Sequence, residues 1–214
     1  MRITGGAQSV GHQYLTLLAA LISVAFFIWP ARPGTFVPPA GHTELSMEPD
    51  TPSAKPLKLP LVSPRIVVHK SKRELILYSG DKIVRVYKVG LGFHPDGPKQ
   101  RQADGRTPEG DYYICSKNPK SSYYLSLGLS YPNEHDAARG LSEGLIDKSQ
   151  YQAIVTAMKE RSRPLWDTRL GGEVFIHGDG SSRDWTLGCI ALDNPAMKEL
   201  FDAVPAGTPV TLRP

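Results

Sequence analysis

The sequence is poor in cysteine, in aromatic residues and in excess charge of either sign. Only two cysteines, Cys115 and Cys189, occur in 214 residues, and no group of cysteines and histidines has the spacing of a structural zinc site. Lysine and arginine number 25 against 21 acidic residues, a formal net charge of +4. This small, mixed excess is not the basic patch that nucleic-acid binding requires. We therefore expect no metal, no cofactor and no nucleic-acid partner.

Long hydrophobic runs are also rare, and the one that occurs lies near the N-terminus. Tyr14–Trp29 is apolar and uncharged over 16 residues. A membrane-spanning helix needs about 20 such residues, and a signal-peptide core has roughly 7–15. No small-residue cleavage site follows the run. We expect residues 1–30 to be an uncleaved signal-anchor in the cytoplasmic membrane, with a removed signal peptide as the alternative. Both interpretations export the rest of the chain.

Proline is concentrated after this run. Nine of the 19 prolines fall between Pro30 and Pro64, with few aromatic residues among them. Such a segment cannot bury enough apolar surface to fold, and it favours extended conformations. We expect residues 31–64 to be a linker and residues 65–214 to be the folded domain.

The folded part is predicted to be mainly β. Short runs rich in β-branched and aromatic residues alternate with polar turns, a pattern typical of consecutive hairpins. The glycine- and proline-rich segment 90–110 separates the early runs from the later ones and is predicted to be a loop. The expected strands are Ile66–Val68, Leu75–Tyr78, Ile83–Val89, Tyr112–Ile114, Tyr123–Pro132 and Thr208–Leu212.

Two helices stand out from this β pattern. Tyr151, Ile154, Val155 and Met158 form an apolar stripe at helical spacing, with Asp147 or Ser149 as the cap. A second helix precedes the last strand. Asn194 is its expected cap, and Pro195 stands at its first position. The sequence thus predicts a mainly β domain with two or three peripheral helices and no internal repeat.

A histidine and a cysteine frame a polar loop in residues 174–192, which read VFIHGDGSSRDWTLGCIAL. His177 ends one apolar run and Cys189 begins the next, so the two side chains are expected at adjacent strand ends. The imidazole would take the thiol proton and lower the thiol pKa from about 8.5 to below neutrality. Gly188 would let a backbone N–H face a developing oxyanion. The alternative is a buried, inert cysteine beside a hydrogen-bonded histidine.

This segment resembles the signature of the YkuD-type L,D-transpeptidases, which are cysteine enzymes of bacterial peptidoglycan. The shared pattern is His-Gly, a loop, and then Thr-x-Gly-Cys, and the wording Asp-Trp-Thr-x-Gly-Cys-Ile-Ala resembles the YafK-like branch. Arg106–Gly110 resembles the Thr-Pro-x-Gly element upstream in that family. One departure is visible, because many members carry an arginine two residues after the cysteine, where this chain has Ala191.

The resemblance implies a curled β-sandwich and a defined chemistry. Cys189 would be the nucleophile and His177 the general base, with a backbone carbonyl near Gly178 orienting the imidazole. The thiol would attack the carbonyl of diaminopimelate in a peptidoglycan stem peptide, and an amine would take the acyl group. Cys189 must stay reduced for this reaction, so Cys115 is expected to be an unpaired strand residue.

Three further residues of the loop are candidates for substrate binding. Arg183 could replace the arginine missing at Ala191, Trp185 could form a wall of the cleft, and Thr186 adjoins the nucleophile. The alternatives are a solvated Arg183 and a Trp185 that plugs the sandwich.

Two other functions remain open. The same residues serve a hydrolase, acting as an L,D-carboxypeptidase or releasing a lipoprotein from peptidoglycan, as in the YafK-like branch. An inactive module that binds the cell wall is the second alternative, and Ala191 is the feature in its favour. In each case we expect the domain on the periplasmic side of the cell envelope.

Overall fold

The computed structural model describes residues 56–214, and the structural statements below concern this part of the chain. The expected anchor Tyr14–Trp29 and most of the expected linker lie outside the described residues. Within residues 56–214, no helix has both the length and the apolar composition to cross a membrane. Leu57 and Leu61, in the C-terminal part of the expected linker, pack against the hydrophobic core.

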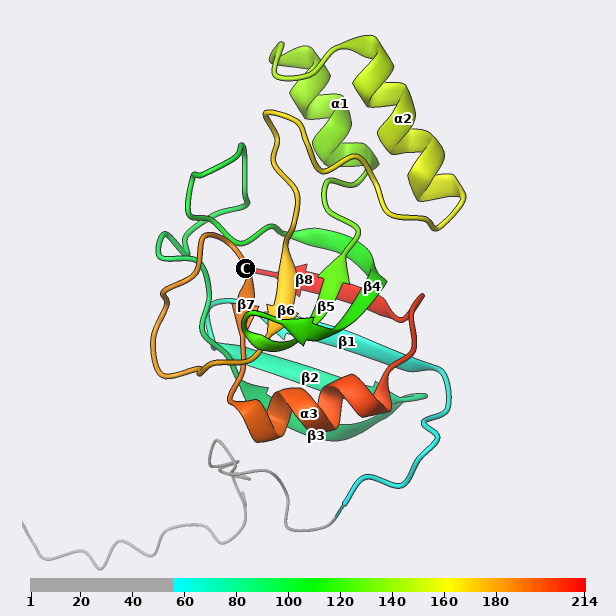
Figure 1. The fold of residues 1–214 in the computed structure, drawn as a ribbon, viewed down its shortest axis with the longest axis vertical. Coiled ribbons are helices and arrows are strands. Elements are labelled where there is room, and N and C mark those ends of the chain that lie inside the picture. The colour runs from blue at the N-terminus through cyan, green and yellow to red at the C-terminus, as the bar shows by residue number, and fades with distance from the viewer. Residues whose placement is uncertain (1–55) are drawn as a thin grey trace, which may run out of the picture. The chain divides into compact units, whose positions relative to one another are not determined.

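Eight strands form one curled sheet in the order β3-β2-β1-β8-β4-β5-β6-β7 (Figure 1). The first three strands pair antiparallel as two successive hairpins, as the sequence predicts. The last strand of the chain then pairs in parallel with the first strand. The strands are β1 (Pro64–His69), β2 (Glu74–Ser79), β3 (Lys82–Lys88), β4 (Gly110–Ser121), β5 (Tyr124–Leu129), β6 (Phe175–His177), β7 (Ile190–Ala191) and β8 (Pro209–Arg213).

Strand β4 joins the two halves of the sheet. Gly110 to Tyr113 pair with β8, and Ile114 to Ser121 pair with β5. The expected strand Tyr112–Ile114 is therefore too short, because β4 continues through a polar stretch that pairs with β5. The Lys117 side chain in this stretch also donates to the Phe201 and Val204 carbonyls. The expected strand Tyr123–Pro132 is too long, since β5 ends at Leu129.

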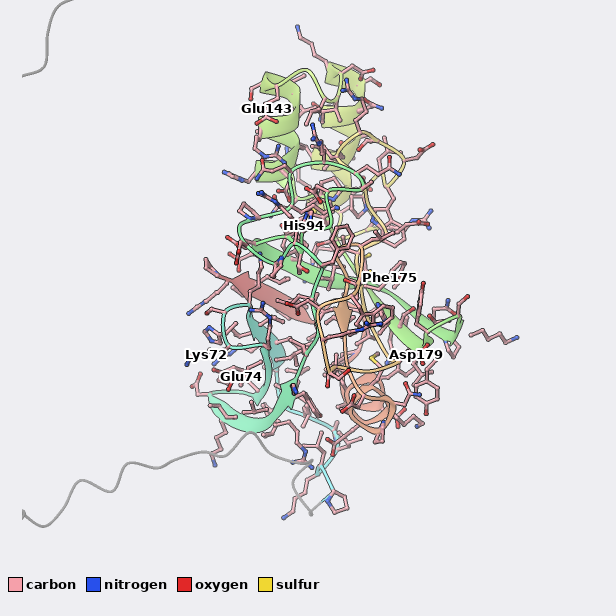
Figure 2. All side chains as sticks on the ribbon, turned by 90° about the vertical axis from the view of Figure 1, so that its left-hand side faces the viewer. Lys72, Glu74, His94, Glu143, Phe175 and Asp179 are labelled. Atoms are coloured by element: carbon pink, nitrogen blue, oxygen red, sulfur yellow. The ribbon has the colours of Figure 1, made fainter. Side chains whose placement is uncertain are left out.

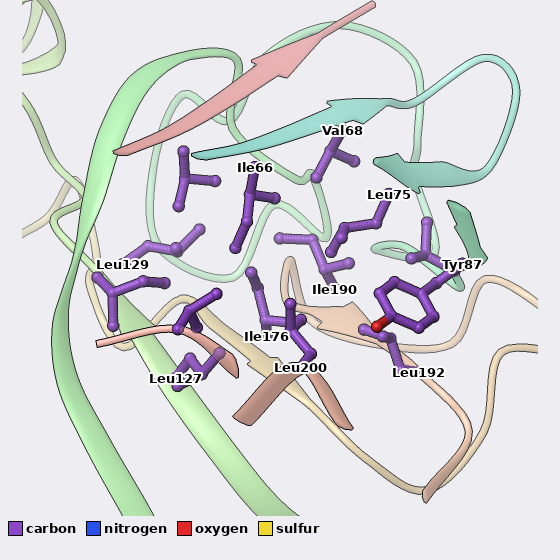
Figure 3. Close-up of a cluster of buried hydrophobic side chains, with 14 of the residues drawn as sticks. Ile66, Val68, Leu75, Tyr87, Leu127, Leu129, Ile176, Ile190, Leu192 and Leu200 are labelled. Atoms are coloured by element: carbon purple, nitrogen blue, oxygen red, sulfur yellow. The ribbon is translucent and has the colours of Figure 1, made fainter. Parts of the chain in front are cut away.

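The curl of the sheet encloses the main hydrophobic core. Figure 3 shows Ile66 of β1 and Leu75 of β2 in this core together with Ile176 of β6 and Ile190 of β7. Helix α3 (Asn194–Ala203) contributes Leu200 to the same core. Burial of these apolar side chains is the main stabilising term of the fold. It also fixes the positions of β6 and β7.

Helices α1 (Glu134–Ser142) and α2 (Lys148–Lys159) pack against each other beyond the sheet (Figure 1). Asp147 caps α2 through a capping box with Gln150, as the sequence predicts. The sequence did not predict α1 as a separate helix. The pair has a small core of its own, formed by Ala137, Ile146, Ile154 and Leu170.

The start of α3 differs from expectation. Its cap is Asp193, not Asn194, and no side chain caps it. The Asn194 side chain instead accepts a hydrogen bond from the Asp179 N–H, and Asp193 accepts one from the Ser181 N–H. Both side chains therefore hold the loop between β6 and β7, the loop that leads to Cys189.

Candidate active site

Strands β6 and β7 run parallel and place Cys189 beside Phe175. Ile176 pairs with Ile190, and the Phe175 N–H lies 3.4 Å from the Cys189 Sγ. Both isoleucines face the core, and side chains alternate along a strand, so Phe175, His177 and Cys189 belong to the opposite face. In Figure 2, Phe175 and Asp179 mark the two ends of the segment that carries His177. His177 ends β6 and Cys189 directly precedes β7, but in this parallel pair His177 lies opposite Ala191. Cys189 therefore lies beside the start of β6 and not beside its end, where the expectation of adjacent strand ends placed it.

His177 and Cys189 line one open cavity of about 460 Å³. The hairpin between β4 and β5 forms one wall of this cavity, and the loop before Cys189 forms another. Its lining residues are Asn118, Lys120, Ser121, Ser122, Tyr123, Ser126, Glu173, Phe175, His177, Trp185, Thr186, Leu187 and Cys189. A peptide entering this cavity would meet the imidazole and the thiol together.

The His177 ring is held in one orientation. Its Nδ1 lies 2.8 Å from the Gly178 carbonyl oxygen, and the side chain is only 3% exposed. A carbonyl only accepts hydrogen bonds, so Nδ1 carries the proton and Nε2 is the free base. Tyr123 packs against the imidazole at 4.8 Å between ring centroids, and Trp185 meets it edge-on at 5.5 Å. The expectation that a backbone carbonyl near Gly178 orients the imidazole is met.

Burial favours the neutral form of both groups. It lowers the pKa of His177 below its usual value, against the opposing effects of the Gly178 hydrogen bond and the Asp179 charge. It raises the pKa of the Cys189 thiol to about 11, against the opposing effects of the Phe175 N–H and the Lys99 charge. The expected thiolate with a pKa below neutrality is therefore wrong for this resting structure. The two groups rest as a neutral thiol and a neutral imidazole.

The Thr186 side chain organises the turn before Cys189. Its hydroxyl donates to the Cys189 carbonyl at 2.8 Å and accepts from the Gly188 N–H at 3.1 Å. The Gly188 N–H is therefore engaged by Thr186. The expectation that a backbone N–H around Gly188 and Cys189 faces a developing oxyanion stays a prediction. Outside the helices and strands of residues 56–214, the Cys189 N–H makes no hydrogen bond to a backbone carbonyl.

Gly188 occupies a position that only glycine fits. Its φ is +132°, and an added Cβ would lie 2.5 Å from the Arg106 carbonyl oxygen. Gly92 approaches the same point closely, since its own added Cβ would lie 3.2 Å from the Gly188 Cα. The loop of residues 90–110 thus packs directly on the turn that carries the thiol.

Gly188→Ala is expected to destabilise the fold and displace the thiol. Backbone strain at this φ costs about 1–3 kcal/mol, and the contact with Arg106 adds to that cost. Gly144→Ala is the matched control, because Gly144 has a φ of +67° and nothing within 4 Å of an added Cβ. Denaturant unfolding of both variants measures the difference. Equal loss of stability would show that the close approach to Arg106 is unimportant.

A second, smaller cavity reaches Cys189 from a different side. Its volume is about 240 Å³, and Gly188, Cys189 and Glu173 line it, but His177 does not. Lys99 from the 90–110 loop lines it as well. The thiol therefore lies at the junction of two cavities, one of which contains the base.

Comparison with known proteins identifies the fold family. The model of the YkuD family, described as the L,D-transpeptidase catalytic domain, matches residues 63–212. The chain belongs to this family. The match includes the three helices and the eight strands of the described residues, except for Arg213 at the end of β8.

Among curated proteins, YafK of Escherichia coli strain K12 is 29% identical to this chain over 163 residues. Its name assigns it provisionally to the L,D-transpeptidases. The alignment covers 72% of this chain and 53% of YafK, and YafK of strain O157:H7 matches equally. This L,D-transpeptidase chain thus spans about half the length of the curated relatives it matches.

Solved structures give weaker likenesses. The helical cell shape determining protein Pgp2 of Campylobacter jejuni, as its K307A mutant, has a TM-score of 0.49 at 24% identity, over 72% of this chain and 47% of that one. An L,D-transpeptidase of Xylanimonas cellulosilytica has a TM-score of 0.43 at 17% identity, over 74% and 64% of the two chains.

Of the three predicted substrate-binding residues, the structure places two at the cavity. Trp185 lines it, with its indole N–H donating to the Gly180 carbonyl at 3.1 Å, and Thr186 lines it while serving the turn. Arg183 is exposed and lines neither cavity beside Cys189, so the structure does not bring it to the site of this L,D-transpeptidase domain. Asp179 is also exposed and does not orient the imidazole.

Several residues of the candidate site were not predicted. The Arg73 guanidinium, on the turn between β1 and β2, pairs with Asp184 at 2.7 Å, and Asp184 also accepts from the Leu91 N–H. This contact anchors the loop before Cys189. Glu173 adopts a φ of +53°, and its carbonyl lies 3.6 Å from the Cys189 Sγ. Neither residue has a sequence pattern that marks it in advance.

Proposed function

We propose that this domain is a peptidoglycan-modifying cysteine enzyme with Cys189 as the nucleophile and His177 as the general base. The observation that carries the proposal is the single cavity that both side chains line, in which the Nδ1–Gly178 contact leaves Nε2 free to take a proton. Membership of the L,D-transpeptidase family supports a peptidoglycan stem peptide as the substrate.

In the first step, the Cys189 Sγ attacks the carbonyl carbon on the L-centre of a diaminopimelate residue. Because the resting thiol is neutral, its proton moves to His177 Nε2 as the new S–C bond forms. The Cys189 N–H donates to the oxyanion of the tetrahedral intermediate. The C–N bond to the terminal D-alanine then breaks, His177 returns the proton to the leaving amine, and a thioester remains.

In the second step, an acceptor attacks the thioester and His177 takes the acceptor's proton. An amine of another stem peptide gives a cross-link, and the thiolate leaves and is reprotonated. The cavity is open and carries Lys120 and Glu173, one charge of each sign, which suits a peptide with both amino and carboxylate groups. We therefore propose amine transfer as the main reaction.

Incubation of residues 56–214 with purified muropeptides and mass analysis of the products tests this function. Cross-linked dimers are expected, and Cys189→Ala should give none. Stem peptides shortened by one D-alanine would show that the enzyme is an L,D-carboxypeptidase and not a transferase. Release of a lipoprotein from peptidoglycan that carries one would assign the lytic reaction instead. If none of these substrates gives a product, an inactive module that binds the cell wall is the interpretation that remains.

The substrate also sets the proposed location, because peptidoglycan lies outside the cytoplasmic membrane. We propose that the domain works on the periplasmic side, anchored through Tyr14–Trp29 in the inner membrane. A reporter that is active only outside the cytoplasm, fused after Pro214 of the full chain, should be active. Activity of a cytoplasm-only reporter at the same position would refute the proposed location.

A further inference from the structure

Lys99 is a buried cation in the loop of residues 90–110. The residue is only 4% exposed, and its Nζ lies 2.9 Å from the Asp104 Oδ1. Among the described residues, Asp104 provides the one hydrogen bond that the ammonium makes. A buried lysine is costly unless its charge is paired or used, so the position calls for an explanation.

The Lys99 ammonium lies next to the turn that carries the nucleophile. A Cβ built on Gly188 would lie 3.5 Å from Nζ, and Lys99, Gly188 and Cys189 line the same 240 Å³ cavity. His177 lines only the larger cavity. The imidazole and the ammonium thus reach the thiol from different cavities.

Asp104, the counterion of Lys99, is also engaged by other donors of its own loop. Asp104 accepts hydrogen bonds from the N–H groups of Gln100, Arg101 and Arg106 as well as from Lys99. Its negative charge is therefore shared among four donors within its own loop. The ammonium is held in place by this arrangement, with Gly188 beside it. Held charges of this kind act strongly in a buried site because no solvent reorganises around them.

We propose that Lys99 stabilises the negative charge that develops on Cys189 when His177 removes the thiol proton. The inference rests on the proposed function, in which Cys189 is the nucleophile. Lys99 also supplies a cation near the thiol in a chain that has Ala191 where many family members carry an arginine. Here the cation comes from the 90–110 loop, far from Cys189 in sequence.

The other charged groups around the thiol act in different ways. Glu173, in the segment before β6, opposes a thiolate by its own negative charge. Lys120, on the hairpin between β4 and β5, lines only the larger cavity. His177 is neutral at rest and becomes positive only after it takes the proton. Lys99 is therefore the cation beside Cys189 before any proton has moved.

The test measures the rate at which iodoacetamide alkylates Cys189 between pH 6 and pH 10, in residues 56–214. Alkylation follows the thiolate fraction, and one unit of thiol pKa changes that fraction about tenfold. Lys99→Met should slow alkylation at pH 8 about tenfold or more and move the profile to higher pH. Lys99→Arg keeps the charge and should remain within about threefold of the wild type.

Asp104→Asn separates electrostatics from structure. Both Lys99→Met and Asp104→Asn break the ion pair, so a purely structural role would move the two profiles in the same direction. If the ammonium stabilises the thiolate, removing its counterion should instead speed alkylation severalfold. Should Asp104→Asn fail to fold, the contrast between Lys99→Met and Lys99→Arg decides alone.

Cys115 is the internal reference for this experiment. Burial also raises the pKa of the Cys115 thiol to about 11, and this thiol lies in β4 without a disulfide. Peptide-resolved mass spectrometry follows both thiols in one sample, and only the Cys189 profile should move. An unchanged Cys189 profile in Lys99→Met, or equal shifts at both cysteines, would overturn the role of Lys99.

The result is separable from the proposed function. Alkylation needs no substrate, whereas the function is tested by muropeptide turnover. Turnover that depends on Cys189, with no shift in Lys99→Met, would refute the inference and leave the function intact. A shift in Lys99→Met with no turnover in the wild type would refute the function alone.

Discussion

Cys189→Ala is expected to abolish muropeptide turnover and to remove the site of acylation by a carbapenem. A carbapenem carries a strained acyl group, and opening its ring by a thiol leaves the whole molecule attached to sulfur. The wild type should therefore gain the mass of the antibiotic on the peptide that contains Cys189. Loss of a catalytic nucleophile lowers the rate by on the order of 10⁴-fold or more. Intact-mass and peptide analysis measure the adduct, and product analysis measures turnover.

Cys115→Ser is the matched control, since Cys115 is the only other thiol in the chain. It lies half-buried in β4 and lines neither cavity beside Cys189. The control should keep both the adduct and the turnover. An adduct that persists in Cys189→Ala and disappears in Cys115→Ser would show that Cys115 is the acylated thiol. That result would refute the proposed mechanism.

The sequence predicted the parts of the fold that depend on local pattern. The hairpins of β1 to β3 follow from alternating apolar residues and polar turns, and Asp147 marks the start of α2. The polar end of β4 was missed. It has no apolar alternation, and it pairs with β5.

Helix α1 was also missed. Its sequence, EHDAARGLS, has a small apolar face, with Ala137 and Gly140 as buried positions. An added Cβ on Gly140 would lie 2.7 Å from Leu170, which is distant in sequence. This contact comes from a distant segment, but the capping box of Asn133 and Asp136 at the start of the helix is a local signal, and the sequence analysis overlooked it.

The site divides in the same way. That His177 ends one strand and Cys189 directly precedes the adjacent strand follows from two apolar runs, because neighbouring runs form neighbouring strands. The loop of residues 90–110 reaches Gly188 from some 80 residues away. Contacts of this range, including that of Lys99, depend on the closed sheet.

Charge states also depend on the closed fold. The sequence predicted an ion pair between the thiol and the imidazole. Burial of both groups favours their neutral forms instead. Desolvation disfavours every charged form, and its size is set by packing around β6 and β7. The residue types at the site were therefore predictable, whereas their protonation was not.

His177→Gln is expected to lower turnover by about 10²–10⁴-fold, the usual contribution of a positioned general base. Glutamine keeps a polar side chain beside the Gly178 carbonyl but cannot take the thiol proton. Its effect should exceed that of substituting Trp185, which packs against the imidazole without reaching the proton. The matched control is Trp185→Phe, which keeps an aromatic ring in the wall of the cavity.

The pH dependence of the wild type gives a second, independent test of His177. Its pKa lies below the usual 6.5, so turnover should decline only at a lower pH than an ordinary imidazole would give, as Nε2 becomes protonated. Protonation also costs stability, because the unfolded chain takes up this proton near pH 6.5 and the folded chain only below that. Stability from this group should therefore fall as the pH drops below about 6.5.

His177→Gln should remove both effects together. The remaining turnover should lose the part of its decline at low pH that is due to His177, and the melting temperature should depend less on pH below about 6.5. The stability effect alone would be expected of any buried histidine, whereas the turnover effect requires that Nε2 act on the reacting proton. A variant with wild-type turnover and an unchanged acid limb would therefore place the general base elsewhere in the cavity, even if the stability change were observed.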